Sequence, residues 1–144
     1  MSKELVVKKT FDHFQSGYCC SESICKAIAE AFSDQSIDIS KTASAFCGGV
    51  GGTKEELCGT FTGGLISIGW LFGRSAPGQD NQVTKELAVK YREEFLKQFG
   101  SVNCGELLCK FGDQEDSIKC KEMTAKAAGL LFDLIQPIIK KGGE

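Results

Sequence analysis

Apolar residues recur every three or four positions along most of the chain, the spacing typical of α-helices with one buried face. The clearest case is the segment 82–99, which Gly100 follows as a C-cap. Its apolar stripe consists of Val83, Leu87, Tyr91, Phe95 and Phe99. The alternation typical of strands is almost absent, so the sequence predicts an all-α fold.

The same spacing predicts further helices over 3–15, 20–32, 57–72 and 103–109, and a last helix from about Ser117. Polar or glycine- and proline-rich connections separate them, at 33–40, 73–81 and 112–116. Asp38 or Ser40 is expected to cap a short helix that ends at Ala45. Pro137 is expected to kink or shorten the last helix.

We therefore expect a single domain over 1–144, a bundle of about five to seven helices. The segment 57–72 is its unusual member, because glycine costs about 1 kcal/mol at each interior helix position. Phe61, Leu65, Ile68 and Phe72 nevertheless keep helical spacing, which predicts a buried, glycine-rich central helix. The segment is too short to span a bilayer.

A second glycine-rich segment, 46–52, precedes this helix. Its glycines lack the spacing of a P-loop or a dinucleotide fingerprint and follow no predicted strand, which argues against nucleotide binding.

Charge and composition narrow the function further. The 144 residues include 17 basic and 19 acidic ones, scattered along the chain, so no basic patch indicates a nucleic-acid partner. The first residues are charged and do not resemble a signal peptide. We expect a soluble cytoplasmic protein without membrane insertion, and the sequence leaves a homo-oligomer open.

Eight cysteines stand out: Cys19, Cys20, Cys25, Cys47, Cys58, Cys104, Cys109 and Cys120. A cytoplasmic chain of this length does not need disulfides to fold, so an excess of cysteines points to metal binding or redox chemistry. The alternative for each is packing in the core, since free cysteine buries readily.

Four cysteines fall at predicted helix starts: Cys20, Cys58, Cys104 and Cys120. Unpaired N–H groups and the positive end of the helix dipole favour a thiolate there, so we expect lowered thiol pKa values. Cys58 is predicted to be the most reactive, because Gly59 leaves its approach open.

The remaining candidates are weaker. No C-x-x-C pair exists, which excludes familiar zinc ribbons, ferredoxin loops and thioredoxin-like sites. His13, the single histidine, is expected to be a partly exposed helix residue. Plain core packing is expected for Cys25, Cys47 and Cys109, while Cys47 beside the glycines, and Cys19, stay open as additions to the site.

The order of Cys20, the run Cys58-Gly59-Thr60-Phe61-Thr62-Gly63, Cys104 and Cys120 resembles the C_GCAxxG_C_C family of redox-active proteins. That family is defined by four cysteines and a CGAxxG motif, in which Thr60 here replaces the alanine. The resemblance runs from about Phe11 to about Ile135 and groups the four cysteines into one site. Gly59 and Gly63 of the motif are the expected cofactor-binding residues.

Two functions of different class follow. In the first, Cys20, Cys58, Cys104 and Cys120 converge for redox work, either as a dithiol/disulfide or as ligands of an iron–sulfur cluster, with an unidentified redox partner. In the second, the same thiolates bind Zn²⁺ for structure alone, or the cysteines merely pack the core of an interaction module. The sequence leaves these alternatives open, and with them whether the protein is an enzyme.

Overall fold

The computed structural model describes residues 1–33 and 38–142. It confirms the all-α prediction, and the expected loop at 33–40 lies partly outside the described residues. The helices are α1 (Lys3–Ser16), α2 (Cys20–Phe32), the 3-10 helix η1 (Ile39–Phe46), α3 (Gly59–Phe72), α4 (Gln82–Phe99), α5 (Cys104–Phe111) and α6 (Ile118–Gly142).

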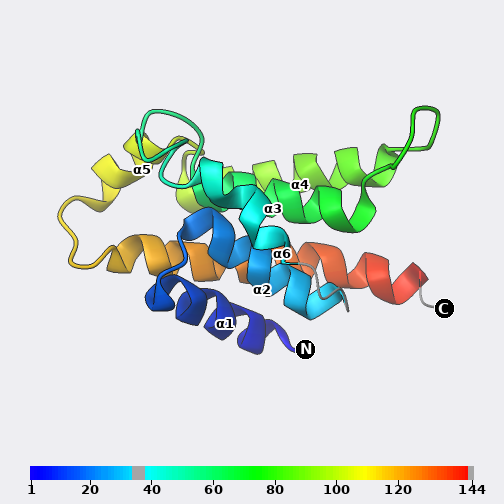
Figure 1. Ribbon diagram of the computed structural model, residues 1–144, viewed down its shortest axis with the longest axis horizontal. Coiled ribbons are helices and arrows are strands. Elements are labelled where there is room, and N and C mark those ends of the chain that lie inside the picture. Colours follow the sequence, from blue (N-terminus) through cyan, green and yellow to red (C-terminus); the bar gives the residue numbers. More distant parts are fainter. Residues whose placement is uncertain (34–37, 143–144) are drawn as a thin grey trace.

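The long helix α6 runs the length of the molecule and packs against α1, α2, α3 and α4 (Figure 1). Its buried stripe, with Ala127, Leu131 and Ile135 fully inaccessible, meets Leu87, Tyr91 and Phe95 of α4 in one hydrophobic core. Val83, at the start of the predicted α4 stripe, is 43 % exposed, so the stripe is buried only from Leu87 onward. No described helix combines the length and the hydrophobicity needed to cross a bilayer.

Local signals explain most helix boundaries. Asp38 caps η1 by accepting a hydrogen bond from the Ser40 amide, and Asn103 caps α5 by accepting one from Glu106. Gly100 ends α4 in the left-handed conformation, as predicted. Pro137 is the exception: α6 continues past it to Gly142, so the expected early end is wrong. Core packing continues on both sides of the proline: Ile135, two residues before it, is fully buried, and Ile138 and Ile139 after it pack against the core.

Glycine lets α2 and α3 approach closely. A Cβ atom on Gly63 would lie within 2.7 Å of the Ile24 side chain and 2.9 Å of the Ser21 Cα. One residue on, the Gly64 backbone lies directly against the Tyr91 ring. The first half of α3 is therefore buried as predicted, whereas Trp70 near its end is exposed.

The segment between η1 and α3 is a compact loop. Gly48, Gly49, Gly51 and Gly52 all have positive φ, and Val50 between them does too, at 70°. A run of left-handed residues is costly for side chains with a Cβ, which explains the glycines. The glycines therefore allow a left-handed turn at this position.

Candidate redox site

Four helix starts converge at one end of the molecule, those of α2, α3, α5 and α6 (Figure 1). Cys20 and Cys104 are the first residues of α2 and α5, Cys58 is the N-cap of α3, and Cys120 lies in the first turn of α6. All four line one cavity of about 320 Å³. The structure thus brings together the four cysteines that the sequence had grouped.

The rest of the lining is largely apolar. It includes Phe14, Leu107, Leu108, Phe111 and Met123. Lys54 is the only charged side chain among the described residues that line the cavity. A weakly solvated environment of this kind strengthens every electrostatic interaction inside it.

An isolated antiparallel β-bridge between Leu57 and Asn103 aligns two of the cysteines. The Cys58 amide donates to the Val102 carbonyl at 2.7 Å, and the Cys104 amide donates to the Glu56 carbonyl at 2.9 Å. Residues 46 positions apart in the sequence are thereby held side by side at the starts of α3 and α5.

Two glycines make room for the sulfur-bearing residues. A Cβ atom on Gly59 would overlap the Cys20 Sγ, so this thiol occupies the space beside the α3 backbone. A Cβ atom on Gly49 would lie 2.6 Å from the Cys104 Cβ. Gly59 lines the cavity, while Gly63 lies one turn further along α3, against Ser21 and Ile24.

Cys120 is oriented by Gln114, a residue that no sequence pattern marked as part of the site. The Gln114 amide nitrogen donates to the Cys120 Sγ at 3.3 Å, and its oxygen accepts from the Cys120 and Lys119 amides. The next residue, Lys121, is buried and donates to Gln15 and Asp116, both at 2.9 Å. A polar residue a few positions before a helix start is a common capping pattern, but it carries no specific signal for contact with a sulfur.

The expected lowering of the thiol pKa values is wrong for three of the four. Burial raises the pKa of Cys20 and Cys104 above the ordinary value and that of Cys58 to about 12. Repulsion among the thiolates adds to this: Cys20 acts on Cys58 and Cys104, and Cys120 acts on Cys20 and Cys104. The Gly48 backbone and the N–H groups at the start of α2 lower the pKa of Cys20, and the Thr60 hydroxyl and N–H groups at the start of α3 lower that of Cys58, but burial outweighs them.

These pKa shifts also bear on the reactivity predicted for Cys58. Its side chain is buried, and Gly59 does not leave its approach open, because the Cys20 sulfur fills that space. Without a bound cation, the Cys58 thiol is protonated and a weak nucleophile at neutral pH.

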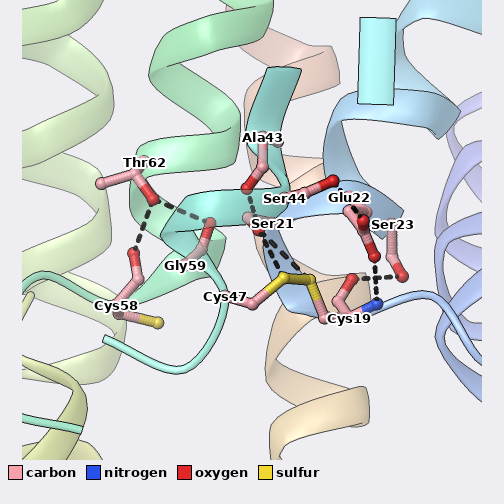
Figure 2. Close-up of a disulfide and its surroundings, with 10 residues drawn as sticks. All are labelled: Cys19, Ser21, Glu22, Ser23, Ala43, Ser44, Cys47, Cys58, Gly59 and Thr62. Atoms are coloured by element: carbon pink, nitrogen blue, oxygen red, sulfur yellow. Dashed lines mark hydrogen bonds between the residues drawn. A yellow bond between two sulfur atoms is a disulfide. The ribbon is translucent and has the colours of Figure 1, made fainter. Parts of the chain in front are cut away.

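A disulfide joins Cys19 to Cys47 at the edge of the same cavity (Figure 2). Their Cα atoms are 5.9 Å apart, within the usual range for a disulfide. Plain core packing for Cys47 is therefore wrong, whereas the expectation that the chain does not need disulfides to fold stays a prediction. The sequence carried one signal, the position of Cys47 beside the glycines.

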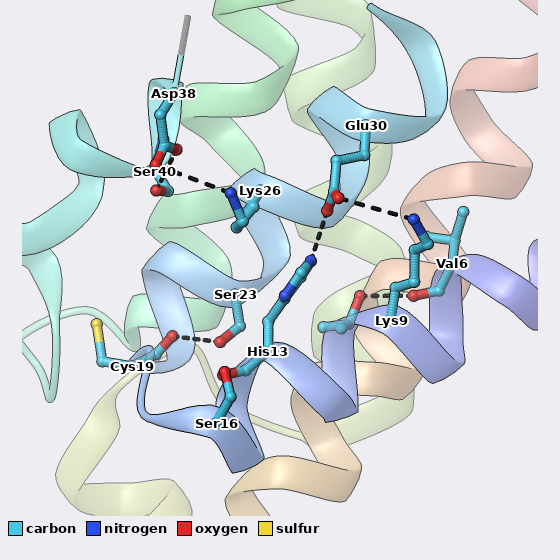
Figure 3. A network of polar contacts seen from close by, with 11 residues as sticks. Val6, Lys9, His13, Ser16, Cys19, Ser23, Lys26, Glu30, Asp38 and Ser40 are labelled. Atoms are coloured by element: carbon cyan, nitrogen blue, oxygen red, sulfur yellow. Dashed lines mark hydrogen bonds and ion pairs between the residues drawn. The ribbon is translucent and has the colours of Figure 1, made fainter. Parts of the chain in front are cut away.

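The other candidates lie away from the cavity. Cys25 is fully buried with Ile39 and Ala43, which confirms core packing, whereas Cys109 is exposed and contradicts it. His13 is partly buried and contacts Glu30, which also pairs with Lys9 (Figure 3). These contacts join α1 to α2.

The fold and the site define an all-α protein with a cavity lined by cysteines and apolar side chains. Residues 18–134 match the family model described as "Putative redox-active protein (C_GCAxxG_C_C)", and the chain belongs to this family. No curated protein and no solved structure matches the chain.

Proposed function

We propose that Cys20, Cys58, Cys104 and Cys120 bind an iron–sulfur cluster through which the protein transfers electrons. The observation that carries the proposal is the convergence of four free thiols, from four separate helix starts, on one cavity. Tetrathiolate ligation is the common way in which proteins hold such clusters.

The electrostatics of the cavity favour a bound cation. Four thiolates would repel one another in this environment, which is part of why the pKa values of Cys20, Cys58 and Cys104 are raised. Iron would neutralise this charge and displace the thiol protons. Backbone N–H groups beside Cys20 and Cys58 would then stabilise the more negative, reduced form of the cluster.

The spacing of the ligand atoms favours a cluster over a single zinc ion. Tetrahedral zinc binds each sulfur at about 2.3 Å, which places the sulfurs about 3.8 Å apart. Among the described residues, the three metal-ligating side chains whose ligand atoms lie within 4.8 Å of one another are Cys19, Glu22 and Cys47, none of them from the set of four. A [4Fe–4S] cluster binds each of its four thiolates through a different iron and so suits more widely separated sulfurs.

The test is anaerobic purification or reconstitution with iron and sulfide, followed by metal analysis and a visible spectrum. We expect a brown protein with absorbance at about 400 nm, and loss of iron in Ser variants of each of the four cysteines. Two matched controls should keep the cluster: Cys109→Ser, which is exposed on α5, and Cys25→Ser, which is buried outside the cavity.

Three results would contradict the proposal. A colourless protein with one zinc per chain would indicate the structural metal site. A metal-free protein in which these four thiols disappear in pairs on oxidation would indicate a dithiol/disulfide cycle instead. Four Ser variants that leave metal content and redox titration unchanged would indicate packing residues only.

A further inference from the structure

We propose that Cys19 and Cys47 form a second, two-electron redox couple in this cavity, a reversible dithiol/disulfide whose substrate is a disulfide compound. Its role as electron acceptor of the cluster rests on the function proposed above. The contacts that support the Cys19–Cys47 couple itself involve no metal.

The disulfide is placed to exchange electrons with the four-cysteine site. Cys19 directly precedes Cys20, and Cys47 directly precedes Gly48, whose backbone lowers the pKa of the Cys20 thiol. Both half-buried residues line the cavity together with the four other cysteines. A short path through bonded neighbours thus connects the two groups.

Ser21 is arranged to stabilise the reduced form. Its Oγ donates its single proton to the Ala43 carbonyl at 2.8 Å and lies 3.3 Å from both the Cys19 and the Cys47 sulfur (Figure 2). Because that proton is engaged, the hydroxyl can only accept from the sulfurs, through its two lone pairs. A disulfide has no proton to offer, whereas two thiols have one each, so these contacts become hydrogen bonds only after reduction.

The backbone around the pair does not depend on the S–S bond. The Cys19 amide donates to one Glu22 carboxylate oxygen at 2.9 Å, and the Ser44 hydroxyl donates to the other at 2.6 Å. With the Ser21–Ala43 hydrogen bond, these contacts join the start of α2 to the end of η1. The two thiols would therefore stay adjacent after reduction, as a reversible couple requires.

Reduction breaks the bond between the two sulfurs and adds two electrons and two protons, giving two thiols. The cluster proposed above would supply the electrons one at a time, a low-potential one-electron donor protein would replenish them, and the protons would come from solvent. In the return step, one thiolate attacks a substrate disulfide and the other resolves the mixed disulfide, releasing two substrate thiols.

The first experiment equilibrates the metal-free, full-length protein with reduced and oxidised glutathione, then alkylates it and identifies modified Cys19 and Cys47 by mass spectrometry. We expect reversible reduction in the folded state. Ser21→Ala should shift the equilibrium toward the disulfide by about threefold to tenfold, the effect of losing two weak hydrogen bonds from the thiols. Ser23→Ala is the matched control, because its hydroxyl donates instead to the Cys19 carbonyl, and should shift it less than about twofold.

The second experiment treats the cluster-loaded protein with dithionite and counts thiols at the same two positions. Two new thiols in the wild type, and none in a Cys58→Ser variant without cluster, would support electron transfer from the cluster. A reduced cluster beside an intact disulfide would overturn it. In the first experiment, a pair that resists reduction until the chain unfolds, or equal effects of Ser21→Ala and Ser23→Ala, would overturn the couple. Absence of iron binding would overturn the cluster and its role as donor, but would leave the glutathione result unaffected.

Discussion

The contact between Gly49 and Cys104 allows a sharp test of how the glycine loop positions the site. In Gly49→Ala, the new Cβ would lie 2.6 Å from the Cys104 Cβ and 2.9 Å from the Lys54 Cα. Neither atom belongs to the flexible end of a side chain, so the loop or the start of α5 must move. Gly51→Ala is the matched control, because Gly51 has a similar φ of 62° and no atom within 4 Å of the same Cβ position.

Both substitutions place an alanine in a left-handed backbone conformation, but only Gly49→Ala also overpacks its surroundings. A left-handed backbone costs an alanine roughly 1–2 kcal/mol, which applies to both positions. Overpacking adds about 1–3 kcal/mol in Gly49→Ala alone. We therefore expect Gly51→Ala to lower the free energy of unfolding by about 1–2 kcal/mol and Gly49→Ala by about 2–5 kcal/mol.

Urea denaturation of the metal-free proteins measures this difference. With a slope of about 1–3 kcal/mol per molar urea, the two midpoints should differ by roughly 1 M. Because the displaced atom belongs to Cys104, Gly49→Ala should also bind less iron on reconstitution, whereas Gly51→Ala should load normally. Equal midpoints and equal iron content in the two variants would refute the inference that this contact positions Cys104.

Three further predictions concern the thiols and their support. The Cys58 thiol has a pKa of about 12 in the folded chain and an ordinary 9.0 when unfolded. The free energy of unfolding of the metal-free protein should therefore fall as the pH rises through this window. In urea melts, Cys58→Ala should flatten this fall, and an unchanged slope would contradict the raised pKa. Thr60→Ala should lower the free energy of unfolding by only about 0.5–1.5 kcal/mol and leave the iron content unchanged. The reason is that its partner Thr124, 2.7 Å away, keeps a second hydrogen bond to the Cys120 carbonyl. A loss of iron would show that the Thr60 hydroxyl supports the site. Gln114→Ala should lower the free energy of unfolding by about 0.5–2 kcal/mol, because α6 loses a helix cap. It should also change the reduction potential of the proposed cluster, measured by electrochemical titration. An unchanged potential would mean that the contact between Gln114 and the Cys120 sulfur is incidental.

Local chemistry made much of this fold predictable. The start of α5 follows from Asn103 as a cap, and the end of α4 follows from Gly100, because each depends on residues only a few positions away. The placement of Cys20, Cys58 and Cys104 at helix starts could be predicted for the same reason. Their convergence on one cavity was suggested by the family resemblance rather than by the helical pattern.

Three features of the structure depend on tertiary packing and could not be predicted from local sequence: the thiol pKa values, the disulfide and the end of α6. The thiol pKa values depend on burial, and the cavity that buries Cys58 is assembled from segments far apart in the chain. The Cys19–Cys47 bond joins residues 28 positions apart through the packing of η1 on α2, which no local pattern indicates. Pro137 shows the same limit, since α6 continues past a residue whose local preference is to end it.

The Cys20 sulfur beside Gly59 has a consequence for how this protein can change over time. The two positions share one volume, so a side chain can grow at either of them only if the other shrinks. A descendant chain that lost Cys20 would lose the tightest obstacle to alanine at position 59, leaving the Phe46 carbonyl oxygen at 3.0 Å and the Ser21 Cβ at 3.3 Å. That alanine would then block the return of the cysteine. Loss of this thiol would therefore be difficult to reverse by single substitutions.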